Sequence, residues 1–195
     1  LLWAAMLIGV WLAFLVAPLG LLLLPLLAFP TASIFRIAVL VVRGGPVSLR
    51  DGLLVWRTDP ASILLVGIVI LGCLAVFLVN IVSGILGGGV IGLVVATAAA
   101  WGAVITWLIS WTVWPLLLDP TRADQPVRER LRLAVLLVLA YPIRLGALGA
   151  VLAAILLVST MALIALMTIS LAFAALVATR YVLPAADSLE EQIRL

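Results

Sequence analysis

Charge is the scarcest feature of this 195-residue sequence, because only 10% of its residues are charged whereas 67% are hydrophobic. A soluble domain is roughly one quarter charged, and the mean hydropathy here reaches +1.45. These values exclude a water-soluble fold and predict a single transmembrane domain over residues 1–195. A net charge of +3 is also too small to indicate nucleic-acid binding.

Histidine and lysine are absent, and Cys73 is the one cysteine. A single cysteine in an apolar run provides neither a disulfide framework nor a thiolate metal cluster. The sequence also lacks paired carboxylates within an apolar run, metal-ligand spacing, a glycine-rich phosphate loop and a nucleophile elbow. We therefore expect no catalytic residues, no metal site, no cofactor and no enzymatic activity. Ion-coupled transport is disfavoured as well, because it usually needs an intramembrane carboxylate or unwound, polar helices.

Most of the sequence consists of long uncharged runs. A helix needs about 20 apolar residues to cross a bilayer, so each run can be compared with that length. The first run predicts a span within Leu1–Leu24, kinked at Pro18, and a turn bracketed by Pro25 and Pro30. A short second helix, Thr31–Arg43, would then run back. Leu1 opens without the basic leader of a secretory signal, so we expect a further polar segment before it.

The second run, Pro60–Leu118, would be about 88 Å long as one helix, which is far too long for one crossing. We expect a hairpin that turns at the breaker cluster Ser83–Gly89, with spans at Ala61–Val82 and Val90–Trp111. The third run, between Arg144 and Arg180, would measure about 52 Å. Two short helices that turn near Ser159–Met161 are favoured there, and one long tilted helix is the alternative. The polar tail after Pro184 is expected to form a frayed or docked helix.

Two charged segments separate the apolar runs. Residues 44–60 predict a short interfacial helix with a capping box between Ser48 and Asp51 and with Leu49, Leu53 and Trp56 on one face. Asp59 and Pro60 are typical of an N-cap followed by proline at the first helical position.

The other segment, residues 119–144, holds eight of the nineteen charged residues. It predicts a helix that starts at Pro126, capped by Asp124 or Gln125, and a further helix that starts at Pro142. We call these two charged segments the elbows. Residues 46–67 and 126–149 both begin with Pro-Val, continue through a charged turn and an apolar stretch and end in a proline-initiated span. This pattern suggests a loose parallel repeat with halves 30–83 and 89–163.

The arginines set the orientation, because cytoplasmic loops hold the basic residues. Apart from Arg36, they occur at the two elbows and in the C-terminal tail, whereas the predicted turns near Pro25, Gly87 and Ser159 hold none. We therefore predict an all-α polytopic bundle of about six helices, arranged as three hairpins with two interfacial elbow helices. Both termini would be cytoplasmic in a bacterial plasma membrane.

Candidate functional residues fall into three groups. Residues for partner docking lie on the elbows, and polar or small residues lie within the spans. Arg36 either snorkels to the interface or binds an anion, and Asn80 either caps backbone at a helix interface or binds substrate. The docking group is Arg50, Trp56, Arg57, Arg128, Arg130 and Arg132, and the packing group is Gly88, Gly92 and Ala96, continued by Ala99 and Ala103. The small-residue stripe serves internal packing first and a dimer face second.

Tryptophans cluster toward the end of the second run. Trp107, Trp111 and Trp114 follow Trp101 and fall at i, i+4 and i+7 on one helical face. Indole rings beside a charged loop are expected as interfacial anchors. An aromatic platform for sugar stacking is the alternative.

Four landmarks lie along the chain, namely the opening Leu1–Trp3, the exit Phe29–Ala32, the basic loop with Trp56 and the elbow that closes at Tyr141–Arg144. Together they resemble the YesL-like family of bacterial membrane proteins. The resemblance covers nearly the whole chain and implies a bacterial plasma membrane protein associated with carbohydrate ABC transporters. It implies no active-site residues.

Three functions are compatible with these observations. The first is a non-catalytic accessory or assembly factor for carbohydrate ABC uptake, with the elbows as docking surfaces. The second is a permease-like transport component with residues 48–58 as a cytoplasmic coupling elbow. The third is a structural homo-oligomer packed through Gly88 and Gly92.

Overall fold

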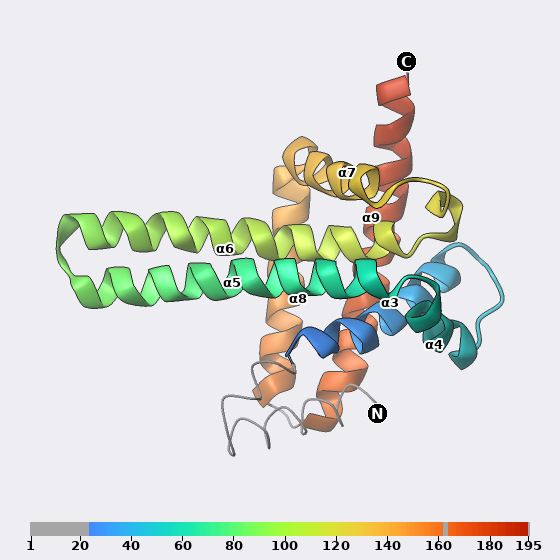
Figure 1. Cartoon of the computed structure of the whole chain (residues 1–195), viewed down its shortest axis with the longest axis horizontal. Coiled ribbons are helices and arrows are strands. Elements are labelled where there is room, and N and C mark those ends of the chain that lie inside the picture. The colour runs from blue at the N-terminus through green and yellow to red at the C-terminus, as the bar shows by residue number, and fades with distance from the viewer. Residues whose placement is uncertain (1–23, 162–163, 195) are drawn as a thin grey trace.

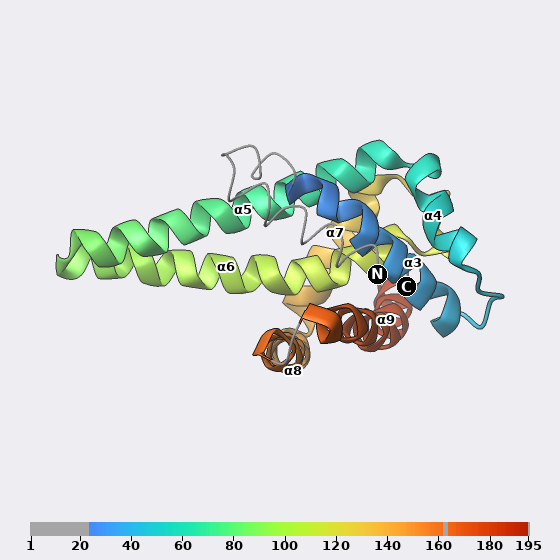
Figure 2. The ribbon, with the colours of Figure 1, turned by 90° about the horizontal axis from the view of Figure 1, so that it is seen from below.

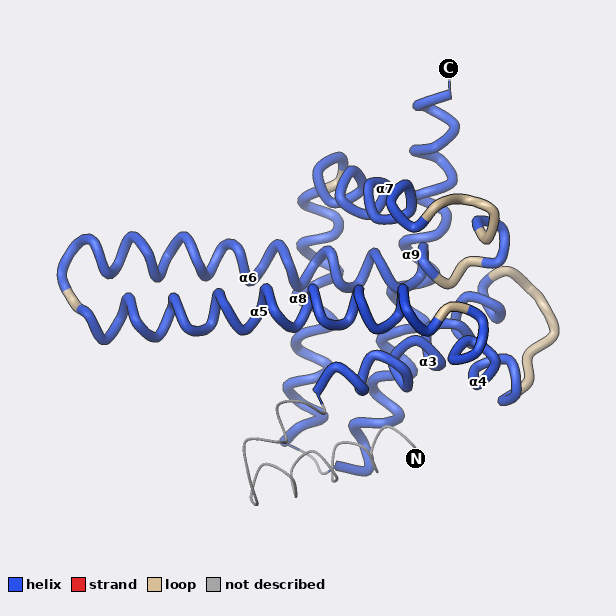
Figure 3. The backbone as a smooth tube through the Cα atoms, in the orientation of Figure 1, coloured by secondary structure: helices blue, strands red, loops and turns tan. Residues whose placement is uncertain are grey.

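The computed structural model describes residues 24–161 and 164–194, and these residues are almost entirely helical, with no strand among them (Figure 3). The predicted all-α class is therefore confirmed. In chain order the elements are η1 (Leu24–Leu27), α3 (Ala28–Val42), α4 (Leu49–Thr58), α5 (Pro60–Gly87), α6 (Gly89–Leu117), η2 (Pro120–Arg122), α7 (Val127–Ala140), α8 (Pro142–Met161) and α9 (Ile164–Arg194). The expected span within Leu1–Leu24, with its kink at Pro18, lies outside the described residues except at Leu24.

Four stretches of the described chain are long and apolar enough to cross a membrane, namely Pro25–Val42, Pro60–Gly87, Gly89–Leu117 and Ile169–Ile193. Helices α7 and α8 together form a fifth candidate, bent by 100° at their junction. By length and composition the chain is a multi-pass helical membrane protein.

Prolines explain several helix boundaries. Asp59 caps α5 by accepting from the backbone N–H of Ser62, and Pro60 occupies the first position of α5, as predicted. The turn predicted between Pro25 and Pro30 is wrong, because η1 and α3 run through both residues. Pro30 lies in the first turn of α3, where a backbone N–H has no helical acceptor and its absence costs nothing.

Two further boundaries differ from the prediction because proline is tolerated inside helices that have close neighbours. Helix α6 continues through Pro115 instead of ending near Trp111, and α9 continues through Pro184 to Arg194. The separate helix expected after Pro184 is therefore part of α9. The prediction of two helices rather than one between Arg144 and Arg180 is confirmed, since α8 ends at Met161 and α9 begins at Ile164.

The α5–α6 hairpin is confirmed, but its turn is tighter than the predicted Ser83–Gly89. Only Gly88 separates the two helices, and φ is +65° at Gly88 and +69° at Gly89, a region that favours glycine. The assignment of Gly88 to the packing stripe is therefore wrong, because it forms the turn and an added Cβ would meet nothing within 4 Å. Gly84 lies instead within α5, at its contact with α6.

The two long helix pairs cross each other. In Figure 1 the α5–α6 hairpin lies horizontally while α8 and α9 run side by side across it, and Figure 2 shows α8 and α9 end-on beside the same hairpin. Two pairs that run crosswise cannot both lie along the bilayer normal. If one pair stands upright in the membrane, the other must be strongly tilted.

The core lies where α3, the C-terminal end of α6, α7 and α9 meet. Phe35 of α3 lies 5.8 Å from Trp111 and 6.5 Å from Trp114, measured between ring centroids. Both tryptophans are only 6% exposed. Their prediction as interfacial anchors is wrong, because the face they share packs on α3 rather than on headgroups. Trp101 is the more exposed indole, at 66%.

The two elbows form the short helices α4 and α7. In α4 the predicted capping box is present, and the Asp51 carboxylate accepts from the backbone N–H of Ser48 at 2.9 Å. The face of α4 that packs on the fold contains Gly52 and Val55, whereas Leu49 and Leu53 of the predicted apolar face are exposed. In α7 the N-cap position belongs to Pro126, and neither Asp124 nor Gln125 caps the helix as predicted.

Candidate functional site

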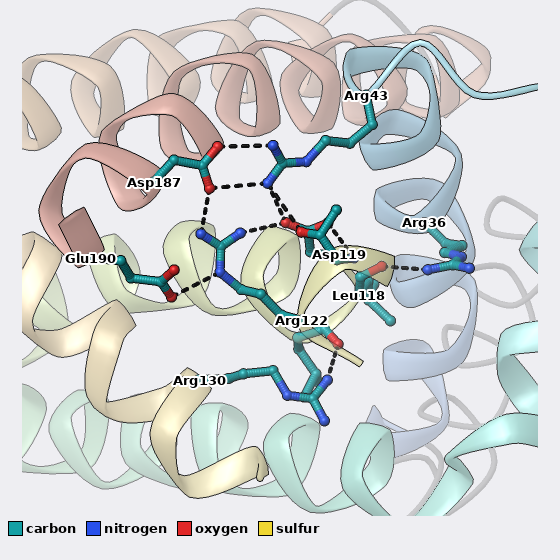
Figure 4. Close-up of polar contacts among 10 residues, drawn as sticks. Arg36, Arg43, Leu118, Asp119, Arg122, Arg130, Asp187 and Glu190 are labelled. Atoms are coloured by element: carbon teal, nitrogen blue, oxygen red, sulfur yellow. Dashed lines mark hydrogen bonds and ion pairs between the residues drawn. The ribbon is translucent and has the colours of Figure 1, made fainter. Parts of the chain in front are cut away.

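A cluster of five charged side chains joins three segments that lie far apart in the sequence (Figure 4). Arg43 follows the C-terminus of α3, Asp119 and Arg122 lie at η2, and Asp187 and Glu190 lie one turn apart on α9. We call these five residues the charge cluster. Arg43 donates to Asp119 at 2.6 Å and to Asp187 at 2.8 Å. Arg122 contacts Asp119, Asp187 at 2.5 Å and Glu190 at 3.1 Å.

The centre of the charge cluster is removed from solvent. The side chain of Asp119 is 0% exposed and that of Arg122 is 3% exposed, whereas Asp187 is 44% exposed. Burial alone would raise the pKa of Asp119, but hydrogen bonds from Arg43 and from Thr121 outweigh it and hold this pKa below its usual value. Asp119 is therefore ionised at neutral pH.

The two arginines of the charge cluster remain cationic for related reasons. Hydrogen bonds to Asp187 and Asp119 raise the pKa of Arg43. Burial lowers the pKa of Arg122, but its hydrogen bonds to Glu190 and Asp187 outweigh burial and raise it overall. Two guanidinium groups thus face three carboxylates. Their ion pairs link α3, the α6–α7 connection and α9.

A second pair of arginines caps the C-terminus of α6. Arg36 of α3 donates to the carbonyl of Leu118 at 2.6 Å, and Arg130 of α7 donates to the carbonyl of Leu117 at 2.6 Å (Figure 4). The last carbonyls of a helix lack helical donors and carry the negative end of the helix dipole. Arg36 therefore bonds to a helix end, which neither of its two predicted roles includes.

A cavity of about 470 Å³ lies beside this helix end. It is bordered by α3, by α4, by the start of α5 and by the α6–α7 connection. Its lining residues are Arg36, Asp51, Leu54, Val55, Thr58, Asp59, Ile63, Leu117, Leu118, Asp119, Pro120, Ala123 and Arg130.

The structure separates the six residues predicted for partner docking into two sets. Arg50, Arg57, Arg128 and Arg132 are exposed and make no ion pair within the described part of the chain. Trp56 is half-buried and donates its indole N–H to Ser33 at 2.6 Å and to the carbonyl of Phe29 at 3.1 Å. Trp56 thus fastens α4 to α3, and Arg130 holds the end of α6.

The remaining predicted residues either pack between helices or bond to the backbone of their own helix. The Asn80 amide donates to the carbonyl of Val76 one turn earlier at 2.9 Å. Gly92 and Ala96 lie against Gly84, where an added Cβ would come within 2.5 Å of the Gly92 carbonyl oxygen. The stripe is therefore used for intramolecular packing between α5 and α6, as first predicted.

Three tryptophans of α6, Trp107, Trp111 and Trp114, border a smaller cavity of about 270 Å³. Two hydroxyls also line it, but Thr31 donates to the carbonyl of Leu27 and Ser110 donates to that of Trp107. Trp107 donates to the carbonyl of Gly149 at 3.3 Å, which ties α6 to α8. These contacts fix the aromatic cluster as a junction between helices.

Sequence reasoning missed the charge cluster. It used these five charges only to place the polar segments and the cytoplasmic side. A local signal was present, because an i, i+3 pair occurs at Asp119 and Arg122 and another i, i+3 spacing at Asp187 and Glu190. Nothing local, however, specifies that Arg43 pairs with Asp187, since 144 residues separate them.

Comparison with known proteins gives no family assignment. No protein-family model matches the chain, and searches of curated proteins and of solved structures find no match either. Residues 24–161 and 164–194 contain no group of three or more His, Cys, Asp or Glu side chains that could hold a metal ion.

Proposed function

We propose that this chain is a non-catalytic accessory or assembly protein for carbohydrate ABC uptake in a bacterial plasma membrane. It binds a partner subunit through Arg50 and Arg57 of α4 and through Arg128 and Arg132 of α7. These four residues are called the docking arginines below. Because basic residues gather in cytoplasmic loops, we expect the docking arginines to lie on the cytoplasmic side of the membrane.

The observation that carries this proposal is the contrast between free and engaged arginines. Arg36, Arg43, Arg122 and Arg130 are bound within the fold to carbonyls or carboxylates. The docking arginines are exposed, and no carboxylate pairs with them in the described chain. Exposed cations on two short helices offer a charge-complementary surface to an acidic partner.

The resemblance of the landmarks at Leu1–Trp3, Phe29–Ala32, Trp56 and Tyr141–Arg144 to YesL-like proteins supports the choice of partner. That resemblance implies association with carbohydrate ABC transporters. The partner is then a cytoplasmic ATPase subunit or the cytoplasmic face of a permease.

The test is affinity purification of the full chain in mild detergent from its native membrane, followed by mass spectrometry. We expect the wild type to recover an ATPase, permease or solute-binding subunit. Arg50→Glu with Arg57→Glu should lower that recovery at least about tenfold, because like charges across an interface cost several kcal/mol. The matched control, Arg50→Lys with Arg57→Lys, keeps the charge and should retain most of the recovery.

Two results would contradict the proposal. One is recovery of no transporter subunit with the wild type at normal membrane abundance. The other is equal recovery with the glutamate and lysine variants.

A permease-like component is the second candidate, and the exposure of Leu49 and Leu53 on α4 favours it. An exposed apolar edge beside Arg50 and Arg57 is suited to insertion into an ATPase groove, as a coupling helix requires. In this case the glutamate variant abolishes sugar uptake outright while the protein stays in the membrane. An accessory factor would instead leave residual uptake by a complex assembled without it.

A further inference from the structure

The cavity of about 470 Å³ carries charges that neither the charge cluster nor the docking arginines use. Its cationic groups are Arg36 from α3 and Arg130 from α7. Each uses a terminal nitrogen to hold one α6 carbonyl, Leu118 or Leu117. A guanidinium has five N–H donors in a fixed fork, so most of the donors on each group stay available. The Nε of Arg130 is buried and has no partner among the described residues.

Carboxylates from a different part of the fold line the same cavity. Asp51 of α4 accepts through one oxygen from the backbone of Ser48, and Asp59 accepts through one oxygen from the backbone of Ser62. A carboxylate has about four acceptor sites, so both retain acceptor capacity. The third lining carboxylate, Asp119, is already paired with Arg43 and Arg122.

The formal charges of the four remaining groups cancel, because Arg36 and Arg130 balance Asp51 and Asp59. A ligand with only negative charge would meet the two carboxylates, and a ligand with only positive charge would meet the two guanidinium groups. A ligand that carries one of each satisfies both sets without leaving a net charge in the cavity.

The position of the cavity indicates a lipid. Its apolar lining includes Leu54, Ile63 and Leu117, and it lies beside the start of the candidate span α5 and the end of the candidate span α6. Basic pockets at such positions between membrane helices suit phospholipid headgroups. An apolar wall beside the charged groups can hold the start of an acyl chain.

We propose that this cavity binds a phospholipid whose headgroup carries both a phosphate and a primary ammonium. The phosphate lies at Arg36 and Arg130, and the ammonium donates to Asp51 and Asp59. A primary ammonium has three N–H donors for carboxylate oxygens, which a trimethylammonium group lacks. The site therefore selects phosphatidylethanolamine over phosphatidylcholine and over phosphatidylglycerol.

The experiment is native mass spectrometry of the full chain, delipidated in detergent and titrated with dioctanoyl phosphatidylethanolamine, phosphatidylcholine or phosphatidylglycerol. We expect phosphatidylethanolamine to bind about tenfold more tightly than the other two, corresponding to one hydrogen bond to a charged group. Glycerophosphoethanolamine, which has the headgroup without acyl chains, should bind at least about tenfold more weakly than the lipid because it buries no chain.

Variants test the two halves of the site separately. Arg130→Gln should weaken all three lipids about tenfold. Asp59→Asn should remove only the preference for phosphatidylethanolamine over phosphatidylglycerol, because asparagine caps a helix about as well as aspartate but carries no charge. Arg144→Gln is the matched control, since Arg144 is exposed, lies outside the cavity and is not one of the docking arginines, and this variant should bind as the wild type does.

Three outcomes would overturn the proposal. They are equal binding of phosphatidylethanolamine and phosphatidylglycerol, unchanged binding to Arg130→Gln, and binding of glycerophosphoethanolamine as tight as that of the lipid. The thermal transition of each variant is measured without lipid in the same detergent. If Arg130→Gln does not give the wild-type transition, Asp59→Asn decides the outcome, since its predicted loss of headgroup preference does not depend on the α6 cap.

Discussion

Replacing Arg122 by glutamine tests whether the charge cluster holds the fold together. Arg122 is 3% exposed and contacts Asp119, Asp187 and Glu190. Removing one partner from a buried ion pair usually costs about 3–5 kcal/mol, because the other charge stays buried without compensation. Here Asp187 and Glu190 are 44% and 23% exposed and can be hydrated again, and the buried Asp119 keeps Arg43 at 2.6 Å as a second partner, so no carboxylate is left fully without compensation. We therefore expect the free energy of unfolding to fall by about 2 kcal/mol, between the loss for an exposed pair and that for an isolated buried pair.

The assay is reversible unfolding in mixed micelles, monitored by tryptophan fluorescence. Trp111 and Trp114 are suitable probes because both are buried in the core beside α3. Arg128→Gln is the control, since it removes an exposed arginine and should change the free energy of unfolding by less than about 0.5 kcal/mol. The reasoning is refuted if Arg122→Gln destabilises by less than about 1 kcal/mol, the value typical of an exposed pair.

A double variant refines this test. Asp119→Asn combined with Arg122→Gln removes the buried carboxylate together with its cation. We expect the double variant to be less destabilised than the sum of the two single variants, because each single variant already removes the contact between Asp119 and Arg122 and the sum counts that contact twice. Additive losses would show that the pair does not act as a unit.

Two further predictions concern helix packing and pH. Gly84→Leu should destabilise the α5–α6 hairpin by about 1–3 kcal/mol, because an added Cβ would lie 2.5 Å from a backbone oxygen of α6. The control is Gly72→Leu on the same helix, where an added Cβ meets open space, and it should be nearly neutral in the same unfolding assay. Equal effects of the two variants would contradict the packing. The fold lowers the pKa of Asp119. The stability that its ionised carboxylate contributes is therefore fully present above the unfolded pKa of about 3.9 and is lost as the pH falls through the lower folded pKa. Unfolding free energies measured from pH 7 downward should therefore decline below about pH 4 more steeply for the wild type than for Asp119→Asn, and parallel curves would contradict this assignment.

Local patterns in the sequence were sufficient for much of the fold. Asp59 and Pro60 specify a helix start through their own side chains, and Gly88 specifies a turn through its freedom to adopt positive φ. Both effects act within a few residues, so no tertiary knowledge was needed. Pro30, Pro115 and Pro184 were harder, because a proline ends a helix, starts it or stays within it according to the helices that surround it.

The candidate sites depended more strongly on long-range contacts. The spacing of Trp107, Trp111 and Trp114 placed them on one face, but only the position of α3 decided that Trp111 and Trp114 face protein. The same holds for the arginines. Arg130 and Arg132 look equivalent in the sequence, yet Arg130 reaches the end of α6 while Arg132 is exposed.

The sequence alone determined that this is a multi-pass α-helical membrane protein, where its hairpin turns and where its short polar helices lie. Those properties follow from hydrophobicity, capping and backbone preferences, all of which act over a few residues. Only the tertiary structure decided that the α5–α6 hairpin crosses α8 and α9 and that Arg43 and Arg122 meet carboxylates of α9. The physical reason is that an ionic contact depends on distance in space, and the helices that bring Arg43 to Asp187 are ordered by packing across the whole chain.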